Sequence, residues 1–147
     1  MSITVRRASV QDAAAYARIM GDPSVYPGLM QMPYTNEELW RARLTETCAP
    51  GKTDLLLVAE LDGTVVGSAG LHPAGASQRR RYALMLGISV VADAQGRGLG
   101  SALMAAMCDY SDRWVGALRL ELTVTDSTHA MVRFHPQPPA IIAAAIA

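Results

Sequence analysis

Apolar and polar residues follow two different spacings in the first third of the chain. They alternate in residues 3–6, which predicts a strand with one buried face. A Ser-x-x-acid pattern at Ser9 and Asp12 then predicts a helix start, and apolar residues recur at helical spacing after it. A second pattern of this kind, at Thr35 and Glu38, predicts a second helix. One strand is therefore followed by two helices.

The rest of the patterned chain predicts strands around one further helix. Two apolar runs in residues 54–71 are separated by Asp62 and Gly63, a dipeptide suited to a tight turn, and they predict an antiparallel hairpin. Residues 82–91 predict a long buried strand, and the alternation in residues 118–125 predicts another. Between them a helical stripe consists of Leu99, Leu103, Met107 and Tyr110. The predicted order is β-α-α-β-β-β-α-β, an α/β (α+β) fold with an irregular end.

Composition limits the classes of partner. Thirteen basic residues balance thirteen acidic ones, whereas a nucleic-acid binder normally carries excess positive charge. No segment approaches the roughly 20 apolar residues that cross a bilayer. Cys48 and Cys108 lack the close spacing of a metal or redox site. We therefore expect a cytoplasmic protein that binds a small molecule, with no metal, nucleic-acid or membrane partner.

A glycine-rich turn at residues 95–100 precedes the third helix, with glycine at alternate positions. Unpaired N–H groups and partial positive charge at a helix N-terminus make such a turn a site for a pyrophosphate. A mononucleotide P-loop requires Gly-Lys-Ser/Thr, but here Gly100 is followed by Ser101 and Ala102. A dinucleotide fold requires G-x-G-x-x-G near the first strand, and this turn has a different spacing late in the chain.

The turn resembles the acetyl-CoA signature of the GNAT N-acetyltransferases, Gln/Arg-x-x-Gly-x-Gly/Ala, through Gln95, Gly98 and Gly100. The wider chain, to about Phe134, is similar to bacterial members that acetylate free amino acids. The resemblance implies a mixed, mostly antiparallel sheet flanked by helices. It also implies that the backbone of Ile88, Ser89 and Val90 binds the pantetheine arm, with the Val90 N–H bonded to the thioester oxygen. The amides implied to hold the pyrophosphate are those of Gln95, Gly96, Arg97, Gly98, Leu99, Gly100 and Ser101.

The acid and base of the family are less clearly matched. Met85 stands where related enzymes often carry an acidic residue, so Glu121 and His72 are the candidate bases, each acting through water. Ser127 occupies the position of an asparagine that contacts the cofactor. Phe134 stands where the family has a tyrosine that protonates the leaving thiolate, and phenylalanine has no proton to donate.

Four apolar or aromatic residues lie between the first two predicted helices, in a loop that shapes the acceptor pocket of this superfamily. They either cap the core or line a pocket for an apolar amino acid such as methionine or phenylalanine. They are Tyr26, Met30, Met32 and Tyr34.

The resemblance divides the chain into an N-acetyltransferase domain, residues 1–135, and an atypical tail, residues 136–147. The tail lacks the closing hairpin that the family would have. We expect either the tail or a second subunit, in a homodimer, to cover the bare edge of the sheet.

Two functions follow from these observations. The first is acetyl-CoA-dependent transfer to the amine of a small acceptor, an amino acid above all, by direct transfer in a ternary complex. The alternative is a catalytically impaired acyl-CoA-binding protein of the same fold, which would bind the coenzyme without turnover.

Overall fold

The computed structural model describes residues 1–25, 31–124 and 142–146, and its strands form one six-stranded sheet in sequence order. Neighbouring strands run antiparallel from β1 to β4, whereas β4 with β5 and β5 with β6 run parallel. The strands are β1 (Ile3–Arg7), β2 (Leu55–Leu61), β3 (Thr64–Pro73), β4 (Ala83–Val90), β5 (Arg119–Val124) and β6 (Ile142–Ile146). The mixed, mostly antiparallel sheet expected from the sequence is confirmed.

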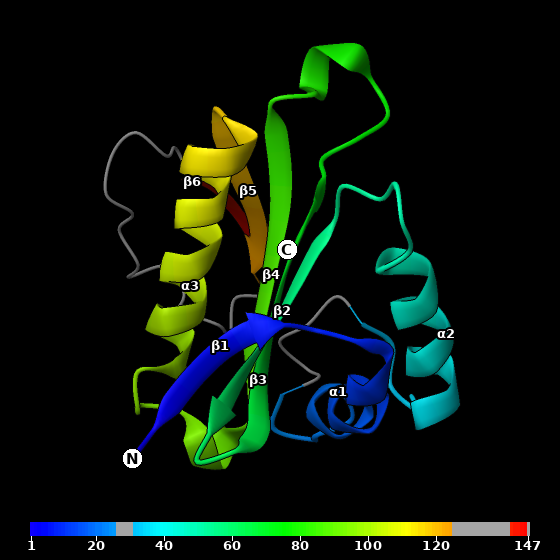
Figure 1. The fold of residues 1–147 in the computed structure, drawn as a ribbon, viewed down its shortest axis with the longest axis vertical. Helices are drawn as coiled ribbons and strands as arrows, with labels where there is room; N and C mark the ends of the chain where they lie inside the picture. Colours follow the sequence, from blue (N-terminus) through cyan, green and yellow to red (C-terminus); the bar gives the residue numbers. More distant parts are fainter. Residues whose placement is uncertain (26–30, 125–141, 147) are drawn as a thin grey trace.

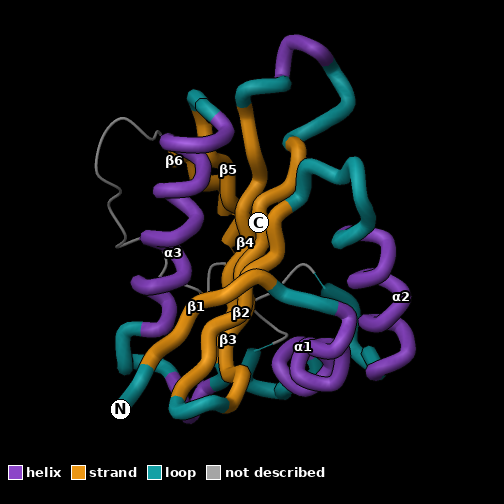
Figure 2. The backbone as a smooth tube through the Cα atoms, viewed as in Figure 1, coloured by secondary structure: helices purple, strands orange, loops and turns teal. Residues whose placement is uncertain are grey.

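Helices cover both faces of the sheet, α1 and α2 on one side and α3 on the other (Figures 1 and 2). They are α1 (Ala13–Met20), α2 (Glu37–Thr47) and α3 (Leu99–Tyr110). Short turns of 3₁₀ helix lie at Val10–Asp12, Gln78–Arg80 and Ala92–Ala94, and a turn of π-helix at Ser111–Val115. In the described part of the chain no helix is long and apolar enough to span a bilayer.

The two faces bury separate clusters. On the α3 face, Leu99, Leu103 and Met107 are fully buried against the sheet. On the other face, Tyr16 of α1 stacks on Trp40 of α2 with ring centroids 5.1 Å apart. Side chains alternate between the two faces along β1, β2, β4 and β5, so residues two apart in these strands share a face. In β3 a register shift opposite Ala59 and Glu60 interrupts the alternation.

The predicted hairpin is confirmed by its turn. Asp62 and Gly63 join β2 to β3 with φ values of 51° and 85°. Positive φ at both central residues is the geometry of a two-residue turn that matches the twist of antiparallel strands.

The helix starts differ from the sequence prediction in detail. The N-cap of α2 is Asn36, not Thr35, because the Asn36 side chain accepts a hydrogen bond of 2.9 Å from the Leu39 N–H. At the start of the first helical segment, the Asp12 carboxylate accepts a hydrogen bond of 2.8 Å from the Ser9 N–H, in line with the predicted Ser-x-x-acid pattern. This segment begins with a 3₁₀ turn, Val10–Asp12, and α1 follows it.

The chain end also differs from the predicted irregular structure. Ile142–Ile146 form β6, which pairs in parallel with β5 over residues 120–124. Unpaired edge groups of β5 supply bonding partners for any extended segment nearby, which is the physical reason for a strand here. The expectation that the tail covers the sheet edge is thus confirmed for these residues. Cover by a second subunit stays a prediction.

Candidate functional site

Strands β4 and β5 part after a short paired stretch. Only Ala83, Leu84 and Met85 pair with β5, at residues 119–121, although β4 continues to Val90 and β5 to Val124. From residue 86 onward β4 has no described strand neighbour on that side. The sheet therefore opens into a wedge between two parallel strands.

The β3–β4 register determines which peptide groups face this wedge. The Val91 N–H donates to Val66 O at 2.9 Å, and the Ala74 N–H donates to Ala83 O at 3.2 Å. Along an antiparallel pair the bonded residues alternate in steps of two, and no irregularity interrupts the register. Residues 83, 85, 87, 89 and 91 therefore bond to β3, and the residues between them turn their peptide groups the other way.

By this alternation the N–H groups of Ile88 and Val90 point into the wedge. The Val90 carbonyl, which faces the same way, accepts a hydrogen bond of 2.9 Å from Gln95 Nε2. This bond ties the first residue of the glycine turn to the end of β4. The Ser89 side chain is buried on the α1 and α2 face, where its hydroxyl lies 3.9 Å from Met20 Sδ, and by the same alternation its backbone N–H and carbonyl face β3. Ser89 therefore directs neither its side chain nor its peptide groups into the wedge.

The glycine turn lies at the mouth of the wedge and opens α3. Gly96 and Gly98 have φ values of 74° and 90°, which side chains rarely adopt. Gly100 has an ordinary φ, yet no described atom lies within 4 Å of the position that a Cβ would take. The positive φ explains why residues 96 and 98 are glycines. At Gly100 the absence of a side chain instead leaves open space beside the backbone.

The first amides of α3 are available to a ligand. The first bond within the helix runs from the Ala102 N–H to Gly98 O at 3.0 Å, so Leu99, Gly100 and Ser101 carry N–H groups that precede the helical ladder. The Leu99 side chain is buried in the core, whereas the side chains of Arg97 and Ser101 are exposed. Leu99 therefore contributes through its backbone alone.

The two candidate bases lie in one row across the sheet. Met85 is opposite His72 on β3 and opposite Glu121 on β5, so the three residues share the α1 and α2 face. Both oxygens of Glu121 accept from Arg80 Nη2 at 2.7 Å, and Oε1 also lies 3.0 Å from Arg119 Nε. Both oxygens of this carboxylate are therefore occupied by contacts with guanidinium groups.

His72 has a different partner. Its Nδ1 lies 2.6 Å from Asp54 Oδ2, in the segment just before β2. Sequence reasoning missed this contact, since Asp54 belongs to no motif. The signal that finds it is the β2–β3 register, in which Leu55 is opposite Leu71 and the preceding and following residues are brought together.

The acceptor candidates are only partly described. Met32 and Tyr34 are 78% and 96% exposed, so of the two alternatives the structure rules out core packing for these side chains. Four further residues named in the sequence prediction lie outside the described residues: Tyr26, Met30, Ser127 and Phe134.

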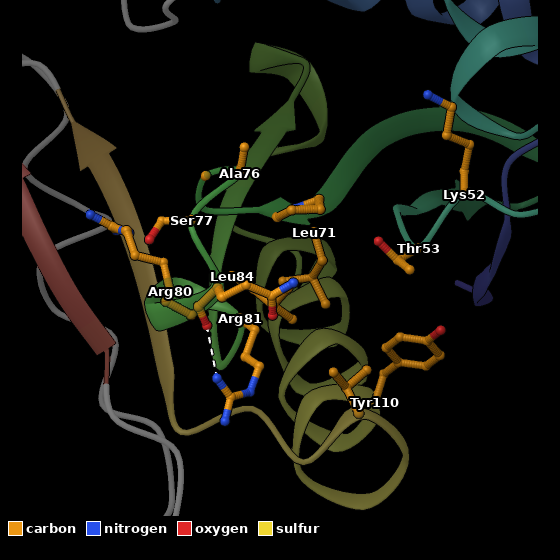
Figure 3. A pocket seen from close by; sticks show the side chains of 14 residues that line it. Lys52, Thr53, Leu71, Ala76, Ser77, Arg80, Arg81, Leu84 and Tyr110 are labelled. Carbon is orange, nitrogen blue, oxygen red and sulfur yellow. Dashed lines mark hydrogen bonds between the residues drawn. The ribbon is translucent and has the colours of Figure 1, made fainter.

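A cavity of about 570 Å³ lies on the α3 face, at the end of β4 remote from the glycine turn (Figure 3). Leu71 and Leu84 form part of its wall, with Tyr110 of α3 on one side and Lys52 on another. Figure 3 also shows Arg81, which donates to the Gln78 carbonyl at 2.9 Å. This cavity lies where β4 and β5 are paired, so it is separate from the wedge.

The family model described as acetyltransferase (GNAT) family matches residues 16–137. The chain belongs to this family. It is 35% identical to the L-amino acid N-acetyltransferase AaaT of Escherichia coli over 122 residues, which are 83% of this chain and 72% of that protein.

Solved structures agree with the GNAT fold. A Salmonella typhimurium protein, YncA, solved with its cofactor acetyl-CoA, superimposes with a TM-score of 0.77 at 22% identity, covering 90% of this chain and 76% of its own. An N-acetyltransferase from Staphylococcus aureus gives a TM-score of 0.78 at 20% identity, with 90% and 79% covered. At these identities the likeness concerns the fold.

Proposed function

We propose that this GNAT chain transfers the acetyl group of acetyl-CoA to the amine of an amino acid, in one step within a ternary complex. The observation that carries the proposal is the wedge between β4 and β5, which ends at the glycine-opened start of α3. A slot lined by outward-facing peptide groups suits an extended arm, and free helix amides suit a diphosphate. Coenzyme A has both parts in that order.

The residues present fit the coenzyme. The amides of Leu99, Gly100 and Ser101 would bind pyrophosphate oxygens, and the open space at Gly100 lets a phosphate approach the backbone. The pantetheine arm would run along β4 as an added strand, from Val90 beside the glycine turn toward Ile88. The resemblance assigns the thioester contact to the Val90 N–H. Because the thioester lies at the end of the arm remote from the pyrophosphate, we propose the Ile88 N–H as the donor to its oxygen, where it would stabilise the negative charge that develops.

The chemistry needs few further groups. The acceptor nitrogen attacks the thioester carbon, the C–N bond forms, and the C–S bond breaks with the electron pair going to sulfur. Holding both reactants in the wedge supplies much of the rate. Thiols are acidic, with an unperturbed pKa of about 8.5, so the thiolate can leave without the tyrosine that Phe134 replaces.

Support for an amino acid acceptor comes from the relative AaaT, whose name specifies L-amino acids. The exposed side chains of Met32 and Tyr34 are available to a substrate and favour an apolar one, such as methionine or phenylalanine. Replacing both residues by alanine should raise KM for such acceptors and leave the affinity for acetyl-CoA unchanged. Unchanged KM would remove them from the acceptor site.

The decisive experiment measures thiol release from acetyl-CoA across a panel of amino acids, simple amines and peptides. Turnover with apolar amino acids supports the proposal. Tight binding of acetyl-CoA in calorimetry without turnover of any acceptor would favour the alternative, an impaired acyl-CoA-binding protein. No heat at high coenzyme concentration would contradict both functions.

A further inference from the structure

We propose that His72, oriented by Asp54, is the general base that removes a proton from the acceptor amine. This inference rests on the proposed acetyl transfer and adds to it a group that acts on the acceptor. An amine is protonated at neutral pH and must lose a proton before it can attack. The ability of His72 to act as a base depends on how the imidazole is held, where its free nitrogen lies, and what lies beside it.

Asp54 fixes the orientation of the ring. The distance of 2.6 Å between His72 Nδ1 and Asp54 Oδ2 is short for an N–H···O bond, as expected when the acceptor is charged. An ionised carboxylate can only accept, so Nδ1 carries the proton and Nε2 carries the lone pair of the neutral ring. The Asp54 side chain is 20% exposed and that of His72 is 43% exposed, so the pair is sheltered on one side and open on the other.

The ring extends along β3 toward the wedge. A Cβ on Gly70 would lie only 2.7 Å from His72 Nε2, so the imidazole covers the Gly70 backbone. Gly70 is opposite Gly87 of β4, two residues beyond Met85 and therefore past the point where β4 and β5 part. The free nitrogen is thus displaced from the paired row of the sheet into the row beside the wedge.

Gly87 leaves room for an acceptor there. No described atom lies within 4 Å of the position of a Cβ on Gly87, and the residue is exposed. Side-chain positions on directly opposite strand residues are about 5 Å apart. A nitrogen that lies between the Gly70 and Gly87 positions can therefore come within hydrogen-bond distance of Nε2, and it stands next to Ile88, whose N–H points into the wedge.

The other groups on this part of the face do not compete. Met85 has no proton-accepting atom of use, and Glu121 is held by Arg80 and Arg119. In this row the Glu121 oxygens are held by arginines, whereas the His72 side chain is 43% exposed and its described side-chain hydrogen bond is the one from Nδ1 to Asp54. Imidazole is also the side chain best suited to proton transfer near neutral pH.

The proton balance follows. The acceptor enters as an ammonium group and gives one proton to His72 Nε2, which passes it to solvent. The freed lone pair forms the C–N bond, and the C–S bond breaks with its electrons going to sulfur. The nitrogen then loses a second proton, which the departing sulfur takes up, so the products are an amide and a thiol.

The test compares His72→Asn, Asp54→Asn and Gly70→Ala with the wild type. Asparagine keeps an N–H that can bond to Asp54 but has no basic nitrogen at the Nε2 position. We expect His72→Asn to lower kcat at pH 7 by about 10²- to 10⁴-fold, with less loss at alkaline pH, where the amine loses its proton unaided. Affinity for acetyl-CoA, measured by calorimetry, should stay within about twofold, because the coenzyme contacts are unchanged.

Gly70→Ala tests the same role of His72 without changing His72 itself, and it replaces His72→Asn in the test if that variant fails to fold. Its Cβ would displace the ring, so kcat should fall with the same recovery at high pH. Asp54→Asn should give a smaller fall, since it affects only the orientation of the ring. The control is Asp109→Asn, an exposed carboxylate on α3 that pairs with Arg113, and it should leave kcat unchanged.

Two outcomes overturn the inference. Wild-type turnover with an unchanged kcat in His72→Asn, or a loss that is equal at every pH, removes His72 from proton transfer while the proposed function stands. A wild type that turns over no acceptor overturns the proposed function and this inference together.

Discussion

Replacing Gly100 by alanine should stabilise the fold and weaken coenzyme binding at the same time. Gly100 is the second residue of α3, and an added Cβ there would meet no described atom within 4 Å. Glycine within a helix costs roughly 0.5–1 kcal/mol relative to alanine, and the lower end applies near a terminus. For a domain of this size, about 0.5 kcal/mol corresponds to a rise in Tm of about 1–2 °C.

The effect on binding has the opposite sign because the same methyl group enters the space assigned to the pyrophosphate. Loss of one hydrogen bond between a backbone N–H and a charged phosphate oxygen costs about 1.5–3 kcal/mol. Since 1.4 kcal/mol is a tenfold change in Kd, the affinity for acetyl-CoA should fall by about 10- to 150-fold.

Calorimetric titration with acetyl-CoA and thermal unfolding without ligand measure the two effects separately. Ala105→Gly is the matched control, since Ala105 is exposed on the same helix one turn further along. This variant should lower Tm and leave Kd unchanged. If Gly100→Ala binds acetyl-CoA as tightly as the wild type, the glycine turn does not hold the coenzyme and the proposed function loses its main support.

Three other perturbations test the fold that supports the site. Leu103→Ala, at a side chain with no exposed surface, should lower the free energy of unfolding in urea by about 2–5 kcal/mol; a smaller loss would contradict the described α3 packing. Hydrogen bonds from Arg6 and Ser9 hold the pKa of Asp12 below its usual value, so its stabilisation is present at neutral pH and disappears as pH falls through that lowered pKa; Asp12→Asn should be less stable at pH 7, with the difference from wild type shrinking below about pH 4. Deleting residues 142–147 frees the edge of β5 and should increase self-association in sedimentation velocity; an unchanged monomer would count against that edge as the reason.

Local features of the site were predictable because single residues encode them. Gly96 and Gly98 adopt positive φ, as a glycine turn before a helix requires, and Asp62 and Gly63 do the same in the hairpin. In each case the side chain, or its absence, restricts the backbone directly, so the pattern in the sequence is sufficient.

Features that join distant segments were not predictable in the same way. The parting of β4 and β5 after Met85 depends on how a strand near residue 83 meets one near residue 119, and no residue at either place encodes that limit. The Asp54–His72 contact depends likewise on the β2–β3 register. The start of α2 lies one residue later than the sequence predicted. Thr35 and Asn36 can both cap a helix, and it is Asn36 that has the extended backbone of an N-cap residue.

The β3–β4 register is the physical feature on which both halves of the proposed chemistry depend. It turns the N–H groups of Ile88 and Val90 into the wedge, and it also places Gly87 opposite Gly70, beneath the imidazole of His72. A slip of one residue would exchange the faces of β4, so that Gly87 would face α3 and the wedge would receive the N–H groups that now bond to β3. Coenzyme geometry and access to the base would then be lost together. Variants that loosen this strand pair should therefore reduce coenzyme affinity and acceptor turnover in parallel, whereas changes confined to His72 should separate them.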